Sequence, residues 1–220
     1  MDPNADRPPR RLFIAAAAGA TVLLLLIGVG VYGLLRGPAT PDTPHTPTSP
    51  TSPAEETRQP NFPPRPVPET PDGEAFARSV AERLFGWDTG LEYGPADYMQ
   101  RLVDVADRAE APGLAADVRG YFPEARAWGE LRQYQTRQWI EIDSIVVPQD
   151  WTAAKAQAGA GQLPPGAIAY TITGTRHRTG MWDGRETSDA RPVAFTIFAA
   201  CTEQDGCRLL RLSAVDQPLR

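Results

Sequence analysis

The stretch Gln138-Trp-Ile-Glu-Ile-Asp-Ser-Ile-Val-Val147 decides the fold class, because the spacing of the apolar residues changes here. Along it, β-branched and polar residues alternate with a period of two, which is typical of a half-buried strand. Upstream, from Asp72 to Leu131, apolar residues recur at the spacing of amphipathic helices. Helices followed by strands predict an α+β domain in which the helices pack on one face of an antiparallel sheet.

Cap residues and prolines divide the helical half into four segments. The first segment follows Asp72, a suitable N-cap, and ends at Gly86. Proline is favoured in the first turn of a helix, and the other three segments open at Pro95, Pro112 and Pro123. We therefore expect four short helices before the first strand.

Three further segments of the second half have the composition of strands, namely residues 167–176, 192–201 and 207–215. A Gly-containing loop over 202–206 joins the last two as a hairpin. The Ala-rich piece 151–160 fits either a short helix or a loop. A helical front half followed by a curved antiparallel four-stranded meander is the order of the cone-shaped folds similar to nuclear transport factor 2.

Residues 12–35 carry no charge. As a helix they would extend about 36 Å, enough to cross the hydrocarbon core of a bilayer. The main alternative is a cleaved signal peptide, but its apolar region is usually shorter and is followed by small residues, whereas here the small residues come first. Three Arg precede the segment and Arg36 alone follows it closely, which predicts a single-pass cell-membrane anchor with a cytoplasmic tail at 1–11 and residues 37–220 outside.

Residues 36–71 are predicted to be a disordered linker rich in Pro and Thr. Between residues 37 and 73 the chain contains 12 Pro and few apolar side chains that could form a core. Such a segment favours polyproline II, in which its reach would be on the order of 110 Å. We expect a passive spacer that holds the folded extracytoplasmic domain, residues 72–220, away from the bilayer.

Charge and composition exclude several classes of function. Residues 72–220 contain 21 Asp plus Glu against 16 Arg plus Lys. Because no basic surplus is present to neutralise phosphates, direct binding of nucleic acid is not expected. The chain has two Cys and two His without the spacing of a zinc site, and it has no phosphate-binding Gly loop. No cofactor or metal is therefore predicted.

Glu141, Asp143 and His177 are the residues considered for catalytic chemistry. Glu141 and Asp143 lie two apart on one expected strand. Inside a cavity, two such carboxyls would repel each other and one could serve as a general base, whereas on the sheet surface they would simply be solvated. His177 stands at an expected strand end. Since no nucleophile, base and orienting group come together, no catalytic residue is assigned.

A candidate protein-interaction site lies at residues 176–191, which are expected to form a loop between two strands. The segment contains Arg176, Arg178, Trp182 and Arg185. Arg and Trp are enriched among the residues that dominate the binding energy of protein interfaces. The alternative is that Trp182 folds back onto the edge of the sheet.

Cys201 and Cys207 end and begin two strands that are expected to pair across a short loop. Outside the cytoplasm thiols are normally oxidised, so position and compartment together predict a hairpin disulfide. Two buried free thiols are the alternative.

The layout of a short cytoplasmic tail, one span, an extended linker and an external domain resembles the bitopic VirB-type scaffold subunits of type IV secretion systems, and the related transfer proteins of Gram-positive conjugative elements. Segments 76–88, 97–102 and 132–147, and the closing strand ending at 211–220, also look like actinobacterial mobile-element proteins of this kind. The resemblance implies a non-enzymatic protein that forms homo-oligomers and binds other membrane channel subunits.

Two other classes of function remain open. An accessory membrane protein of a lipid-import (Mce-type) transporter has a similar layout. A membrane-tethered enzyme or ligand-binding domain would instead use the cavity of the cone, and it requires polar side chains that converge inside that cavity.

Overall fold

The computed structural model describes residues 61–159 and 161–220. The expected cytoplasmic tail at 1–11, the span at 12–35 and most of the linker lie outside the described residues. Among the helices that are described, none combines the length and the apolar character needed to cross a bilayer.

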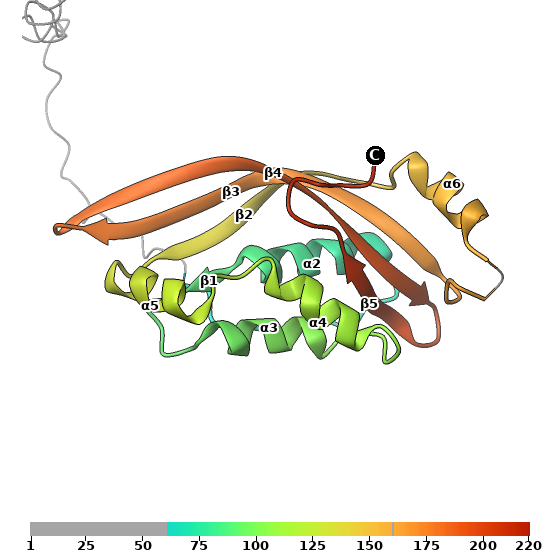
Figure 1. The fold of residues 1–220 in the computed structure, drawn as a ribbon, viewed down its shortest axis with the longest axis horizontal. Coiled ribbons are helices and arrows are strands. Elements are labelled where there is room, and N and C mark those ends of the chain that lie inside the picture. Colours follow the sequence, from blue (N-terminus) through green and yellow to red (C-terminus); the bar gives the residue numbers. More distant parts are fainter. Residues whose placement is uncertain (1–60, 160) are drawn as a thin grey trace, which may run out of the picture. The chain divides into compact units, whose positions relative to one another are not determined.

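Four helices precede the long strands, as the sequence predicts. They are α2 (Gly73–Phe85), α3 (Pro95–Val103), α4 (Ala111–Arg119) and α5 (Ala125–Gln133). Asp72 caps α2, since its Oδ1 accepts hydrogen bonds from the N–H groups of Glu74 at 2.9 Å and Ala75 at 3.1 Å. These four helices lie on the same side of the sheet (Figure 1).

The strands form one antiparallel sheet in chain order. They are β1 (Trp87–Asp88), β2 (Arg137–Val146), β3 (Ala167–Trp182), β4 (Arg185–Thr202) and β5 (Gly206–Leu212). The α+β class and the four predicted strands are confirmed, but the number is corrected, because β1 is a fifth strand that is only two residues long. β3 and β4 are also longer than expected and continue to a shared turn. The Ala-rich piece forms the short helix α6 (Asp150–Gln157).

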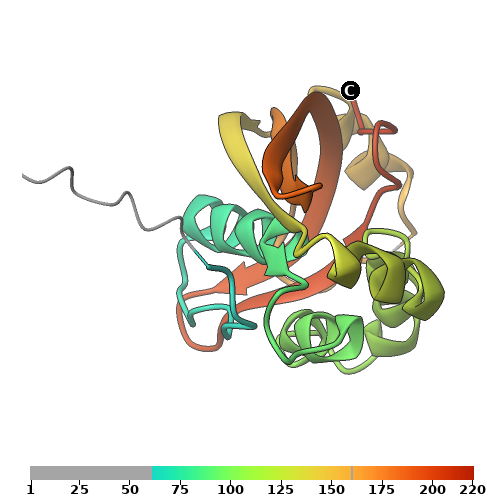
Figure 2. The ribbon, with the colours of Figure 1, turned by 90° about the vertical axis from the view of Figure 1, so that its left-hand side faces the viewer.

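The core lies between α2 and the concave side of the sheet, which curls around this helix (Figure 2). Phe76, Val80 and Leu84 of α2 are each at most 1% exposed, and Ile172 of β3 and Phe195 of β4 are fully buried. Burying a side chain of this size contributes about 1.5–3 kcal/mol. The concave side is therefore occupied by apolar side chains that hold the helical layer to the sheet.

Residues 61–71, which the sequence places in the linker, are packed on the folded domain. The Phe62 ring stacks on Trp139 with the centroids 5.9 Å apart, and the Phe62 carbonyl accepts a hydrogen bond of 2.8 Å from Tyr98 Oη. Val67 is buried. The predicted start of the folded part is therefore too late. Hydrogen bonds to the carbonyls of Phe62, Pro66 and Thr70 hold the segment beside its apolar side chains, and Pro-rich backbone loses little conformational entropy on packing.

Cys201 and Cys207 lie opposite each other on β4 and β5 and are joined by a disulfide, consistent with the sequence prediction.

We predict that mass spectrometry of the native protein finds the peptides containing Cys201 and Cys207 linked, and complete alkylation without reductant would contradict the bond. Replacing both Cys by Ser should lower the free energy of unfolding by about 2 kcal/mol, the chain-entropy value for so short a loop. Gln204→Ser in the same loop is the control and should change little.

A carboxylate joins α4 to β5. Asp117 accepts hydrogen bonds from Arg211 Nε at 2.6 Å, from Arg211 Nη2 at 3.0 Å and from the N–H of Leu212 at 3.1 Å. Burial by itself raises the pKa of Asp117, but these hydrogen bonds and the charge of Arg211 outweigh burial and hold the pKa below its ordinary value.

We predict that Asp117→Asn lowers the free energy of unfolding by about 1–3 kcal/mol at neutral pH, since the hydrogen bonds lose their charge. Because the folded-state pKa is depressed, the contribution is complete above the unfolded pKa of about 3.9 and is lost as the pH falls through the lower folded value. Urea unfolding of the compact unit Thr57–Arg220 at neutral and strongly acidic pH measures both effects. Asp143→Asn, at an exposed position, is the matched control; an equal loss there would contradict the assignment.

Candidate functional site

The outer half of the β3–β4 hairpin, residues 175–192, is here named the arm. Its turn is Asp183-Gly184, between the paired residues Trp182 and Arg185, with φ angles of 48° and 73°. Two successive positive φ angles define a type I′ hairpin turn, which Asp-Gly favours. The predicted loop at 176–191 is therefore wrong, because the whole segment except this turn is paired strand.

The side chains of the arm are segregated by charge between its two faces. Ile172 of β3 and Phe195 of β4 are paired and point into the core, and alternate residues along each strand share that side. The helix-facing side of the arm thus carries four Arg, one Asp and one Trp, which are Arg176, Arg178, Trp182, Arg185, Asp189 and Arg191. The opposite side carries one carboxylate, Glu186.

Arg178 fixes the base of the arm to the core. Its Nη2 donates a hydrogen bond of 2.7 Å to Gln138 Oε1, and the guanidinium lies 5.3 Å from the ring centroid of Trp87. Gln138 is buried and donates in turn to the carbonyl of Phe85 at 3.3 Å. Burial lowers the pKa of Arg178, and the neighbouring charge of Arg176 lowers it further.

One carboxylate serves two of the remaining guanidinium groups. Asp189 Oδ2 lies 3.0 Å from Arg191 Nε and 3.8 Å from Arg176 Nη2. Both ion pairs are partly exposed, so solvent weakens them. The helix-facing side of the arm consequently keeps a surplus of positive charge, with Arg185 exposed beside the turn.

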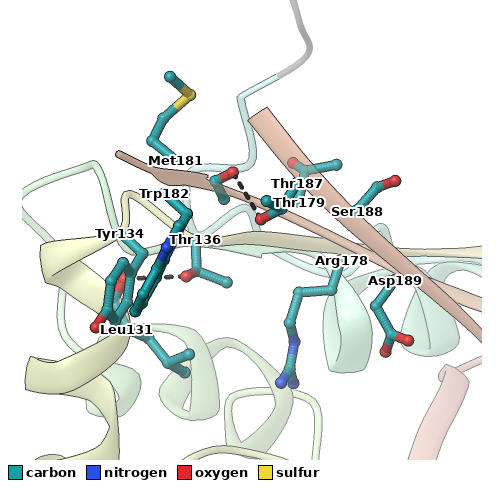
Figure 3. Close-up of a pocket in the computed structure, with 11 residues that line it drawn as sticks. Leu131, Tyr134, Thr136, Arg178, Thr179, Met181, Trp182, Thr187, Ser188 and Asp189 are labelled. Carbon is teal, nitrogen blue, oxygen red and sulfur yellow. Dashed lines mark hydrogen bonds between the residues drawn. The ribbon is translucent and has the colours of Figure 1, made fainter. Parts of the chain in front are cut away.

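A groove of about 250 Å³ lies between the arm and the C-terminal end of α5 (Figure 3). Trp182 stacks on Tyr134, with the ring centroids 5.0 Å apart and an interplanar angle of 23°, yet the residue stays 55% exposed. Leu131 adds apolar surface and Arg178 also lines the groove, whereas the Met181 side chain points away from Trp182, on the opposite face of the arm (Figure 3). Trp182 thus packs on Tyr134 at the end of α5, not on the edge of the sheet as one sequence alternative has it, and its exposed part leaves the interface prediction open.

Among the strands that the structure describes, none covers the outer edge of β4 along the arm. Beside the body of the domain, the N–H of Ser213 donates to the carbonyl of Thr196 at 3.0 Å, and that of Asp216 donates to Ala194 at 2.7 Å. Residues 197–202 of β4 pair with β5, whereas no described strand pairs with the arm portion of β4 on the side away from β3. Pro192 offers no N–H here, and charged side chains line the arm. Both features are usual protections against strand addition, so the faces of the arm are better suited to binding than its edge.

The residues considered for catalysis do not form one site. His177 lies within β3, not at a strand end; it stacks on Trp139 at 5.2 Å, and its Nε2 is 3.3 Å from Glu141 Oε2. A β-bulge between Ile142 and Ser144 interrupts the alternation at Asp143, so a spacing of two no longer places Asp143 and Glu141 on a common face. Both carboxylates are exposed. Among the described residues, no group of three or more His, Cys, Asp and Glu is arranged to hold a metal ion.

Sequence reasoning missed Tyr134, Gln138 and Asp189, which complete this surface. The dipeptide Asp183-Gly184 is a strong hairpin signal and would have extended both strands to Trp182 and its partner. That extension would have brought Asp189 beside Arg178. No comparable signal marks Tyr134, which meets Trp182 only through the tertiary fold.

Comparisons with known proteins do not identify a family. No family model matches the chain, and no curated protein matches it. Among solved structures, the intermembrane space region of the chloroplast protein ARC6 aligns over 64% of this chain and 92% of its own, at 12% sequence identity and a TM-score of 0.29. Neither a fold nor a function is transferred from a similarity of this size.

We predict that Gly184→Ala opens the arm locally. Nothing lies within 4 Å of a Cβ at this position, so the cost of about 1 kcal/mol comes from the positive φ angle alone. Amide hydrogens of 176–182 should exchange faster, while those of α2 should keep their protection. Gly129→Ala, also free of close contacts but in a helix, is the matched control. Equal exchange in both variants would show that the turn does not hold the arm.

Proposed function

We propose that this protein is a non-enzymatic, membrane-anchored scaffold subunit of a cell-envelope translocation complex, and that the process it serves is conjugative transfer of the type IV secretion kind. The observation that carries the proposal is the arm, which presents an exposed Trp among Arg residues on a paired hairpin. Residues of these types dominate the binding energy of many protein interfaces. A hairpin tied to the core also presents them with little ordering cost on binding.

The architecture supports the same proposal. Helices packed inside a curved antiparallel meander are what a cone-shaped fold similar to nuclear transport factor 2 would show, and this is the fold that the resemblance implies. In the proposed topology, residues 12–35 anchor the chain in the membrane with the N-terminus in the cytoplasm. Residues 36–60 then act as a spacer, and the described domain lies outside, where it meets other channel subunits and further copies of itself.

The packing of the domain favours a scaffold over a cavity enzyme. Apolar side chains of α2 occupy the concave side of the sheet, where a cone-shaped site would be expected. The carboxylates of Glu141 and Asp143 are exposed instead of enclosed. A lipid-import accessory protein would share the anchor and the linker, so the phenotype of a deletion strain is needed to separate these two processes.

We predict that the full-length protein restores conjugative transfer in a deletion strain and that a secreted fragment of residues 57–220 does not, because a scaffold has to connect the membrane to the periphery. Trp182→Ala in the full-length protein should lower transfer and partner capture by about tenfold, the effect of losing one interface anchor. Val147→Ala is the matched control, since Val147 is 51% exposed and lies outside the arm.

The outcomes separate the alternatives. A deletion that leaves transfer unchanged but blocks lipid uptake would replace conjugation by lipid import. A secreted domain as active as the full-length protein would contradict any scaffold role. Equal activity of the Trp182 and Val147 variants would remove the arm from the interface.

A further inference from the structure

We propose that the helix-facing side of the arm binds an acidic segment of another protein, with one apolar side chain of that segment seated in the groove beside Trp182. The inference rests on the proposed function, because it takes the arm as an interaction surface. It adds the chemistry of the partner, which the scaffold proposal leaves open.

Charge complementarity is the first argument. Residues 72–220 are acidic as a whole, yet the arm gathers four of their 16 basic residues, and all four lie on one face. Against them stands only Asp189, which gives this face a net charge of +3. Such a local reversal of sign attracts carboxylates and repels a second basic surface.

The existing contacts of Arg176, Arg178 and Arg191 leave this charge unbalanced. Arg178 is engaged by Gln138 and Trp87, neither of which is charged. Arg176 and Arg191 share the single carboxylate of Asp189. A guanidinium offers five N–H donors in a planar fork, so a partner carboxylate can bind it through two parallel hydrogen bonds without displacing Asp189.

The groove supplies the apolar part of the site. Its volume of about 250 Å³ is below the roughly 300–1,000 Å³ of small-molecule pockets, and it suits a single inserted side chain. Tyr134 stacks on Trp182 and holds the indole in place, while the residue is still more than half exposed. An apolar or aromatic side chain that packs here would bury both the indole and Leu131. Buried anchors of this kind, ringed by charged contacts, are typical of interface centres.

The partner is expected to lie across the face of the arm without extending the sheet. Ala194 directs its N–H and carbonyl away from β3, toward Asp216. Pro192, two residues away, falls on the same edge and has no N–H to donate. Side-chain contacts, and therefore the sequence of the partner segment, should determine binding.

The experiment uses the full-length protein in its own cells, with a photo-crosslinking benzoylphenylalanine in place of Thr187, which lines the groove, or of Val147 as the control position. We expect crosslinks from the groove position only. The captured segment should contain more Asp and Glu than Lys and Arg, with an apolar residue at the crosslink.

A synthetic peptide of that segment should then bind the full-length protein. Arg185→Glu should weaken this binding by at least about tenfold, while Arg119→Glu on α4 should leave it within about twofold.

Several results would overturn the inference. Crosslinking would exclude an acidic protein partner at this face if the captured segment is neutral or basic. It would do so equally if the crosslink leads to a second copy of this chain or to a saccharide, or if no crosslink forms from the groove. Binding that is insensitive to Arg185→Glu and to added salt would do the same. If transfer still depends on Trp182 in these cases, the scaffold proposal stands and only the chemistry of the partner is wrong. If transfer does not require the protein at all, the scaffold proposal itself fails.

Discussion

At Gly174, β3 passes so close to the carbonyl oxygen of Glu141 on β2 that a Cβ there would clash with it. The β-bulge at Asp143 lies beside this contact, where the pairing shifts between Ile142 and Ser144. A bulge and a close backbone approach at Gly both increase the twist and bend of a sheet. The bend lets the body of the sheet wrap around α2. It also marks the end of the apolar core on β3, because every residue from Thr175 to Met181 is only partly buried.

The arm begins where the core ends, so other interactions have to hold it. On its helix-facing side, Arg178 bonds to Gln138, which bonds to the last residue of α2. On the opposite side, the rings of Phe62, Trp139 and His177 form a continuous stack. Hydrogen bonds between specific polar groups fix one position of the arm, whereas apolar contacts alone would allow it to shift. The arm is thus held on both faces by contacts to β2 and, near its tip, by Tyr134, whose carbonyl accepts a hydrogen bond of 2.7 Å from the N–H of Met181 and whose ring stacks on Trp182.

The sequence predicted those elements in which burial imposes a period. α2 has an apolar face because it packs on the sheet, and the body of β3 is apolar because it lies under α2. β1 has two residues and no period to detect, and the packing of 61–71 depends on isolated anchors of a kind that Pro-rich segments also contain by chance. The arm is polar on both faces, so alternation carries no signal there, although its Asp183-Gly184 turn does. The Arg residues and Trp182 were identified by type, but their common face and the contribution of Tyr134 follow only from the register of the hairpin and the position of α5.

The two ends of the proposed scaffold meet on the same pair of strands. Phe62, at the start of the described chain, stacks on Trp139 of β2, and Trp139 stacks on His177 of β3, at the base of the arm. In a membrane-anchored protein, tension along the linker would therefore reach β2 and β3 directly, and a partner bound to the arm would be held by those same strands. The helical layer shares this load, because Tyr98 of α3 donates a hydrogen bond to the carbonyl of Phe62 and Arg83 of α2 donates one to the carbonyl of Pro66. An enzyme has no need for its tether to end beside its binding surface, whereas a scaffold that transmits position or force from membrane to periphery does. The short connection between Phe62 and the arm thus supports the scaffold proposal independently of the residue types at the interface.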